Sequence, residues 1–134
     1  MKKTLNIVIA FLISFFVISF FGSCEKAKED KIVGDWRLIS EKEPVPEELV
    51  THFVFFDDNT VKLVSDVTLI ADYSVSSENL HYYLKIIGFE VSFISLGGKY
   101  LINELSKDVL KITRVELSNG EKNGAFKRLE FIKE

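Results

Sequence analysis

The stretch KYLINELSKDVLKITRVEL, residues 99–117, decides the fold. Two runs rich in apolar and β-branched residues, Lys99 to Asn103 and Val109 to Leu117, flank a polar turn from Leu105 to Asp108. Within each run apolar and polar residues largely alternate, which is typical of a strand with one buried face. A short polar link between two such strands lets them pair with each other. The stretch therefore predicts an antiparallel hairpin.

The same pattern continues on both sides of this hairpin, with turn residues about every 8 to 12 positions. The further strands that we expect are Ile32 to Ser40, Val50 to Phe56, Thr60 to Val64, Val67 to Val75, Leu80 to Ile87, Phe89 to Leu96 and Ala125 to Ile132. Ser76 to Asn79 and Gly97-Gly98 are expected turns. Short links predict an all-β, antiparallel up-and-down meander of about eight or nine strands that closes into a β-barrel. The pattern also permits a two-sheet β-sandwich.

The N-terminus has the form of a lipoprotein signal peptide. Lys2 and Lys3 precede an apolar run from Leu5 to Phe21, and Gly22-Ser23 place two small residues before Cys24. We therefore expect residues 1–23 to be removed and the thiol of Cys24 to carry a diacylglyceryl group, with fatty acyl chains such as palmitate. Two alternatives stay open. One is an uncleaved membrane anchor, and the other is an ordinary signal peptide followed by a free cysteine.

Residues 24–31 are expected to form the lipidated cysteine and a polar tether, and residues 32–134 one domain. Lys28-Glu29-Asp30 resembles a cluster that directs some lipoproteins to the cell surface, but an extended hydrated linker is the favoured interpretation. The expected partner at this end of the chain is a membrane, bound through Cys24. The expected location is the cell envelope, and the outer membrane is favoured over the inner one.

The charge of the expected mature chain limits its partners. Residues 24–134 keep 15 of the 17 basic residues and all 20 acidic residues, which gives a net charge of −5. An acidic chain without a basic stripe argues against nucleic acid as a partner, because affinity for nucleic acid comes mainly from neutralised phosphates. The single cysteine excludes an intramolecular disulfide.

The sequence carries no recognisable catalytic motif. His52 and His81 lie in expected strands, and no His, Cys or acidic cluster has the spacing of metal ligands. Phosphate loops and nucleophile elbows are absent. Asp57-Asp58-Asn59 is expected to be a turn rather than part of a calcium loop. We therefore expect no catalytic residues, no metal, no cofactor and no enzymatic activity.

Gly34-Asp35-Trp36 resembles the Gly-x-Trp signature of the lipocalins. Later motifs follow in the order seen in small lipocalin-like domains of bacterial lipoproteins: Phe56 to Val61, Tyr73-Ser74-Val75, Asn79-Leu80, Tyr100 to Ile112 and Leu129-Glu130-Phe131. This resemblance covers nearly all of residues 32–134, although lipocalins are longer and often carry a disulfide and a closing helix.

The resemblance implies a barrel that binds a small apolar molecule, and it implies no reaction. It also implies a basic residue packed across Trp36. Lys127 and Arg128 are the candidates, although the alternation of the last strand turns Arg128 outward.

Aromatic residues could line a ligand cavity, and the candidates are Phe53, Phe55, Tyr73, Tyr82 and Phe93. They could equally fill the core, which is favoured because narrow eight-strand barrels leave little space. Our first hypothesis is a membrane-anchored lipocalin-like barrel that binds a small hydrophobic ligand. The alternative is a non-enzymatic structural or interaction domain with a filled barrel, which contacts another envelope protein.

Overall fold

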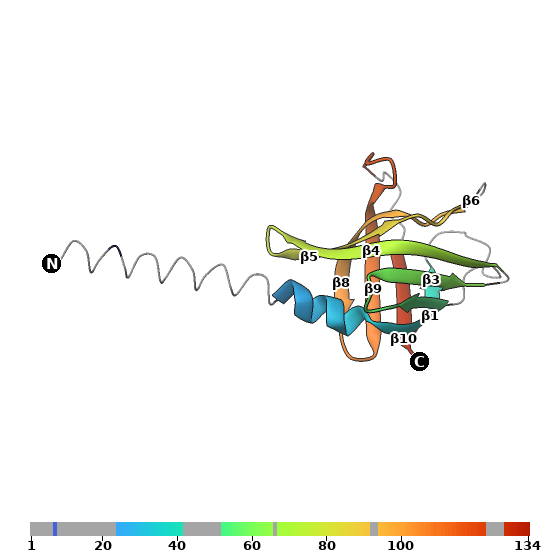
Figure 1. Ribbon diagram of the computed structural model, residues 1–134, viewed down its shortest axis with the longest axis horizontal. Coiled ribbons are helices and arrows are strands. Elements are labelled where there is room, and N and C mark those ends of the chain that lie inside the picture. Colours follow the sequence, from blue (N-terminus) through green and yellow to red (C-terminus); the bar gives the residue numbers. More distant parts are fainter. Residues whose placement is uncertain (1–6, 8–23, 42–51, 66, 92–93, 123–127) are drawn as a thin grey trace.

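The computed structural model describes residues 7, 24–41, 52–65, 67–91, 94–122 and 128–134. The described strands are β1 (Gly34–Glu41), β2 (His52–Phe55), β3 (Thr60–Val64), β4 (Thr68–Glu78), β5 (His81–Ile87), β6 (Glu90–Val91), β7 (Ile94–Ser95), β8 (Gly98–Leu105), β9 (Val109–Leu117) and β10 (Arg128–Lys133). Eight of them form a closed antiparallel barrel, and β6 and β7 form a separate two-stranded sheet (Figure 1).

The barrel follows the order of the chain. Its strands are arranged β1-β10-β9-β8-β5-β4-β3-β2, and β1 closes the ring by pairing with both β2 and β10. Trp36 on β1 lies opposite Phe53 of β2 on one side and opposite Lys133 of β10 on the other. This confirms the antiparallel up-and-down barrel and excludes the two-sheet sandwich.

The hairpin of residues 99–117 forms as predicted, and β9 has the predicted bounds. The strand bounds predicted for Thr60 to Val64 are also confirmed. In both cases the alternation is strong and the turn residues are local, so neighbouring residues alone set the ends of the strand.

The predicted strand from Phe89 to Leu96 is wrong, and so is the predicted Gly97-Gly98 turn. Gly88 (φ 126°) and Phe89 (φ 62°) turn the chain out of the barrel, where β6 and β7 form a short ladder of their own. Gly98 is the first residue of β8 and lies opposite both Ile86 and Leu117. The glycine pair therefore brings the chain back into the barrel.

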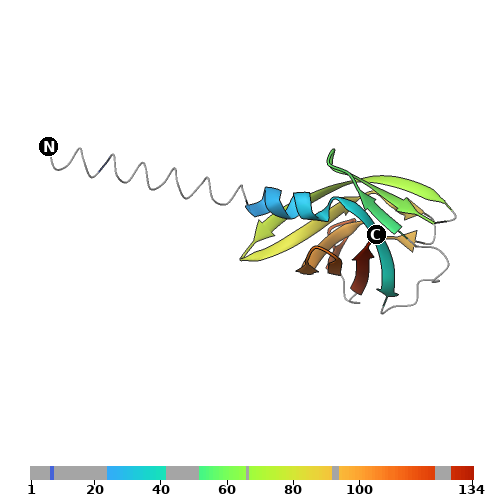
Figure 2. The ribbon, with the colours of Figure 1, turned by 90° about the horizontal axis from the view of Figure 1, so that it is seen from below.

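The link between β4 and β5 is shorter than predicted. Ser76, Ser77 and Glu78 continue β4, and Glu78 lies opposite His81. The turn itself consists of Asn79 (φ 50°) and Leu80 (φ 67°). The result is a long hairpin that projects beyond the rest of the barrel (Figure 2).

The extended linker predicted for residues 25–31 is also wrong, because residues 24–32 are helical. Their side chains contact the barrel: the backbone N–H and the hydroxyl of Ser77 both donate to Glu25 Oε1, at 2.9 and 2.7 Å. Asn59 Nδ2 donates to Glu29 Oε1 at 2.7 Å. Within the described part of the chain, no helix has the length and hydropathy needed to span a bilayer.

The core lies inside the barrel and is rich in aromatic rings. Phe53 is at its centre, with ring centroids 5.0 Å from Phe131, 5.9 Å from Phe89 and 6.2 Å from Phe55. The other buried hydrophobic residues are Ile32, Trp36, Val61, Leu63, Ala71, Tyr73, Leu84, Ile86, Leu96, Tyr100, Leu110, Ile112 and Leu129. These rings and aliphatic side chains pack in tilted contacts, as in an ordinary protein interior.

Candidate functional site

Three of the five predicted ligand-lining residues are core residues. Phe53, Phe55 and Tyr73 are at most 3% exposed, and the rings of Phe55 and Tyr73 meet edge to face at 5.0 Å. Tyr73 donates its hydroxyl to the carbonyl of Phe56 at 2.8 Å. Burial raises the pKa of this hydroxyl to about 12, and nearby carboxylates such as Glu29 add to the rise. The packing of these rings supports the core-filling interpretation.

Tyr82 lies elsewhere, beside the N-terminal helix. The ammonium of Lys28 is 5.1 Å from the centre of its ring, and the side chain of Cys24 contacts its hydroxyl. Partial burial raises the pKa of Tyr82, and Cys24 raises it further. The structure therefore does not bring Tyr82 together with the other candidates, and Phe93 lies outside the described residues.

The Gly34 and Trp36 signature forms one packed unit. Trp36 is fully buried and donates its Nε1–H to the carbonyl of Ile32 at 2.6 Å. Lys133 Nζ lies 5.1 Å from the centre of the Trp36 ring. A Cβ on Gly34, whose φ is 137°, would come within 2.5 Å of Lys133 Cε. The glycine therefore leaves space for the lysine to cover the tryptophan.

This arrangement corrects the expected partner of Trp36. The cation over its ring is Lys133 and not Arg128, and Lys127 lies outside the described residues. Lys133 reaches Trp36 because β1 and β10 close the barrel with these two residues opposite each other. The sequence pattern could not show this register.

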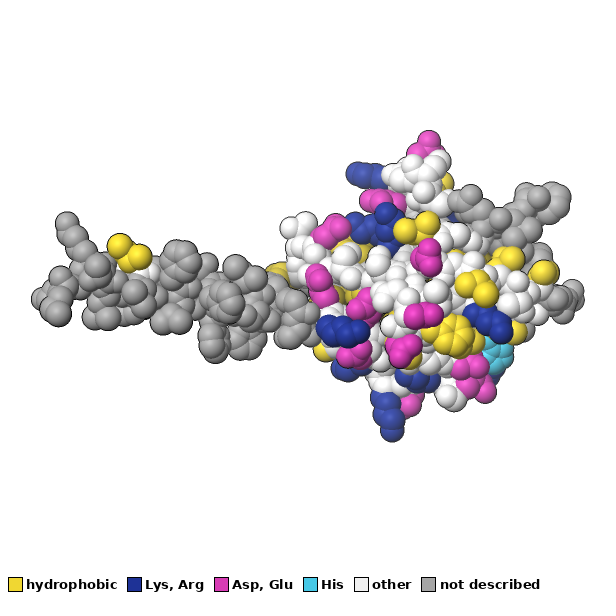
Figure 3. Space-filling view, viewed as in Figure 1, with side chains coloured by type: hydrophobic (Ala, Val, Ile, Leu, Met, Phe, Trp, Pro, Cys, Tyr) yellow, Lys and Arg dark blue, Asp and Glu magenta, His cyan; other side chains and the backbone are white. Residues whose placement is uncertain are grey.

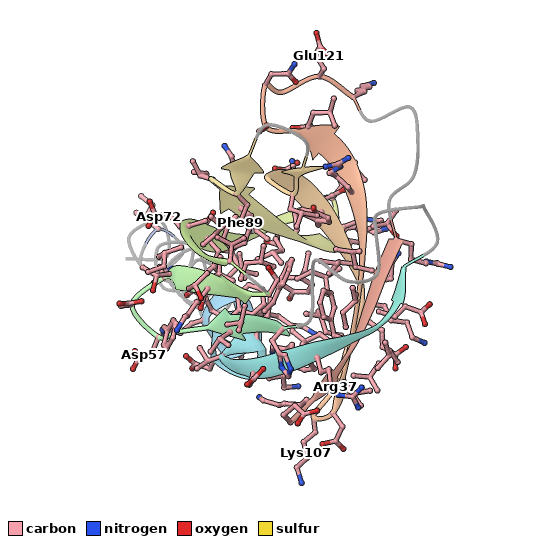
Figure 4. The ribbon with its side chains drawn as sticks, turned by 90° about the vertical axis from the view of Figure 1, so that its right-hand side faces the viewer. Arg37, Asp57, Asp72, Phe89, Lys107 and Glu121 are labelled. Atoms are coloured by element: carbon pink, nitrogen blue, oxygen red, sulfur yellow. The ribbon has the colours of Figure 1, made fainter. Side chains whose placement is uncertain are left out.

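A cleft of about 480 Å³ lies where β5 and β9 end and β8 begins. Its lining residues are Lys85, Ile86, Ile87, Gly88, Phe89, Gly98, Lys99, Glu116, Leu117, Ser118 and Gly120. Phe89, two residues after the end of β5, lies on the same side of Arg37 and Lys107 as the projecting loop that carries Glu121 (Figure 4). None of these residues is among the five ligand-lining candidates that the sequence indicated.

Glycines shape the cleft by letting three backbone segments approach closely. A Cβ on Gly97 would lie 2.6 Å from the carbonyl oxygen of Gly88. A Cβ on Gly98, whose φ is 131°, would collide with the carbonyl of Glu116. The signal in the sequence was the glycine pair at positions 97 and 98, which we interpreted as a turn.

Charged groups border the cleft on its outer side. Lys85 and Lys99 lie opposite each other on β5 and β8, and Glu116 lies opposite Lys99 on β9. Lys99 Nζ donates to both carboxylate oxygens of Glu78 at 2.8 Å, and it lies 4.5 Å from the ring centre of Tyr83. The hydrogen bond with Glu78 raises the pKa of Lys99, so this lysine stays charged. The cleft thus combines an apolar wall with a charged rim.

No family model, curated protein or solved structure matches the chain.

The histidines form no metal site in the part of the chain that the structure describes. His52 Nδ1 lies 2.9 Å from Asp35 Oδ1, and His81 Nδ1 lies 2.9 Å from the carbonyl oxygen of Asn79. Among the described residues, no three His, Cys, Asp or Glu side chains are grouped to hold a metal ion.

Asp57-Asp58-Asn59 forms the predicted turn. Asp58 Oδ1 accepts hydrogen bonds from the hydroxyl of Thr60 at 2.6 Å and from its backbone N–H at 3.0 Å. These bonds lower the pKa of Asp58, the hydroxyl bond most. Asn59 takes a positive φ of 66°, which asparagine tolerates. The carboxylate of Asp58 thus holds the turn together.

Proposed function

We propose that the protein is a lipid-anchored envelope protein whose lipocalin-like barrel binds a small amphipathic molecule in the cleft between β5, β8 and β9. The observation that carries this proposal is the cleft itself. Its volume of about 480 Å³ falls in the range of ligand sites, about 300 to 1,000 Å³. Because aromatic rings occupy the barrel interior, the proposed site is at the end of the barrel.

The chemistry of the cleft indicates what kind of ligand would fit. Ile87, which is 58% exposed, and the partly buried Leu117 offer apolar surface, and Lys85 and Lys99 offer positive charge at the rim. A molecule with an apolar body and an anionic or polar end would match both. Lys99 already forms an ion pair with Glu78, so Lys85 is the better placed of the two lysines to bind the anionic end of a ligand.

The lipocalin-like assignment is supported by the packed unit of Gly34, Trp36 and Lys133, and by the eight-strand barrel. The anchoring proposal is supported by the signal-like sequence before Cys24 and by the exposure of the Cys24 thiol. Replacing Cys24 by serine is expected to abolish labelling with a radioactive fatty acid and to release the protein from membranes. Unchanged labelling would refute the anchoring.

Ligand binding can be tested by native mass spectrometry of the protein purified from the cells that make it. We expect a co-purifying small molecule in the wild type and in Glu121→Phe, which changes the exposed loop outside the cleft lining. Ser118→Phe fills the cleft and should lose that molecule. If no molecule co-purifies, and fatty acids and haem do not raise the melting temperature, the ligand proposal is wrong.

A second candidate function is an interaction domain that contacts another envelope protein. Ile70 on β4 is 71% exposed and Ile87 on β5 is 58% exposed. They are diagonal neighbours on the outer face, because Asp72 lies opposite Ile87. Hydrophobic side chains also gather on the side of the barrel away from the N-terminal helix (Figure 3). A photo-crosslinker at Ile70 should then give a protein adduct, and one at Glu130 on β10 should not.

A further inference from the structure

The turn between β4 and β5 carries a leucine that the fold does not require. Leu80 is 96% exposed, more than any other large hydrophobic residue in the described ranges. Its φ of 67° and that of Asn79, 50°, place both residues in the left-handed region. Two-residue turns of this kind favour asparagine followed by glycine, because a side chain at the second position is strained. A glycine would relieve the strain and remove the exposed apolar surface, so Leu80 calls for another explanation.

The Leu80 turn lies beside the first described residues of the N-terminal helix. Ser77 binds Glu25, and Tyr82, which lies opposite Ser77 in the hairpin, contacts Cys24. Asn79 and Leu80 come two residues further out. Figures 1 and 2 both show the tip of the hairpin next to the start of the helix. Cys24 and the Leu80 turn are therefore at the same end of the molecule.

The N-terminal helix runs alongside β4, and the start of the helix lies at the same end as the Leu80 turn. Glu29 is bonded to Asn59, whose carbonyl accepts the N–H of Tyr73, whereas Glu25 is bonded to Ser77. Passing back from Glu29 to Glu25 thus follows β4 from Tyr73 towards its tip. Acyl chains on Cys24 would place a bilayer at this end, and so would an uncleaved apolar run from Leu5 to Phe21.

We propose that Leu80 inserts into the membrane surface beside Cys24 and forms a second contact that orients the barrel. This inference rests on the proposed anchoring. A membrane-bound amphipathic element buries its apolar side chains at the boundary between headgroups and acyl chains and keeps its polar side chains among the headgroups. Leu80 has such neighbours, since Asn79 and His81 flank it and Glu78 forms its ion pair with Lys99.

This orientation has a consequence for the cleft. His81 begins β5 at the membrane end, and Ile87 ends it at the cleft. Six residues of strand span about 20 Å, at about 3.3 Å for each residue. With Leu80 in the membrane surface, the cleft therefore opens on the water side of the bilayer, at most about that far from it.

The test uses Leu80→Cys in the full chain, produced with its N-terminus processed and purified in detergent. Acylation blocks the thiol of Cys24, and the chain has no other cysteine, so the new thiol is the only one that reacts. An environment-sensitive fluorophore on it is placed in vesicles of phosphatidylethanolamine and phosphatidylglycerol. We expect a blue shift of its emission and quenching by lipids spin-labelled near the headgroup.

Val67→Cys is the matched control. Val67 is also an exposed apolar turn residue, at 60%, but it lies at the opposite end of β4. Its fluorophore should keep the emission seen in water and should not be quenched. Equal, water-like emission at positions 80 and 67, in protein whose mass shows an acylated Cys24, would overturn the proposal. A shift that appears only when cell extract is added would instead indicate a protein partner and would also overturn it.

Two further results separate this proposal from its alternatives. If Cys24 is not acylated, the mass of the protein lacks the acyl chains and the fluorophore labels two thiols instead of one. That result would refute the proposed anchoring. Leu80→Gly should melt at the same temperature as the wild type or higher, because glycine relaxes the turn. A lower melting temperature for Leu80→Gly would mean that Leu80 serves stability and not membrane contact.

Discussion

Replacing Gly98 by alanine is expected to destabilise the barrel strongly, and replacing Gly120 by alanine is expected to do so only weakly. Both glycines have a positive φ, 131° and 83°. A Cβ on Gly98 would collide with the carbonyl oxygen of Glu116 on the neighbouring strand, whereas a Cβ on Gly120 would meet nothing within 4 Å. The pair therefore separates the effect of close approach from the effect of backbone conformation.

The magnitude follows from these contacts. Ordinary van der Waals contact begins at 3.4 Å, so the carbonyl of Glu116 has to retreat by about 1 Å or more. That movement weakens about two ladder hydrogen bonds between β8 and β9, at about 1 kcal/mol each. Backbone strain at the substituted position adds about 1 to 3 kcal/mol. We expect a loss of about 3 to 5 kcal/mol for Gly98→Ala, out of a total stability of about 5 to 15 kcal/mol.

For Gly120→Ala, strain of about 1 kcal/mol is partly offset by the lower entropy of the unfolded chain, about 0.4 to 1 kcal/mol. The expected loss is below about 1 kcal/mol. Urea unfolding of the chain from residue 24, with Cys24→Ser, measures both values through the fluorescence of Trp36, the single tryptophan. Equal losses for the two variants would refute the close approach of β8 and β9 at Gly98.

Three further predictions concern the core. Trp36→Phe removes the donor to the Ile32 carbonyl and should lower the free energy of unfolding by about 1 to 3 kcal/mol. The measurement is urea unfolding followed by circular dichroism. An unchanged midpoint would contradict the buried hydrogen bond. In the same assay, Phe131→Ala should lower the free energy of unfolding by about 3 to 5 kcal/mol, because Phe131 is fully buried against Phe53. A loss of stability below about 1 kcal/mol would indicate a loosely packed interior and contradict this prediction. The pKa of Tyr73 is about 12 in the folded protein and about 10 in an unfolded chain. The folded state therefore keeps a proton that the unfolded state loses, and stability should fall as pH rises from about 10 to about 12. Tyr73→Phe should reduce this slope in unfolding experiments over that range, and an identical slope would disprove the shift.

Local signals in the sequence were sufficient for most strands. β3 and β9 have the predicted bounds because alternation and turn chemistry act between neighbouring residues. The hairpin turn at Asp58 was likewise readable, since its carboxylate binds the residue two positions later. Phe53 and Phe55 were candidates for a cavity lining, and the narrowness of an eight-strand barrel favoured the core-filling interpretation that their burial supports.

The sequence failed where a residue's role depends on a distant segment. Gly97-Gly98 has the composition of a turn, yet it permits a close approach to Gly88 and Glu116. The N-terminal helix has the composition of a solvated linker, yet Glu25 binds Ser77 of β4 and Glu29 binds Asn59 in the turn between β2 and β3. The cleft was missed for the same reason, because its lining comes from three strands that meet only in the folded barrel.

By itself, the sequence determined that the chain is an antiparallel all-β protein with a signal-like N-terminus, because alternation, turn residues and hydropathy are properties of neighbouring residues. Only the tertiary structure decided which ends of the chain meet. Closure of the barrel places Lys133 of β10 over Trp36 of β1, almost a hundred residues apart. Register across a closing pair of strands depends on the twist and length of every strand between them, and no local pattern encodes it.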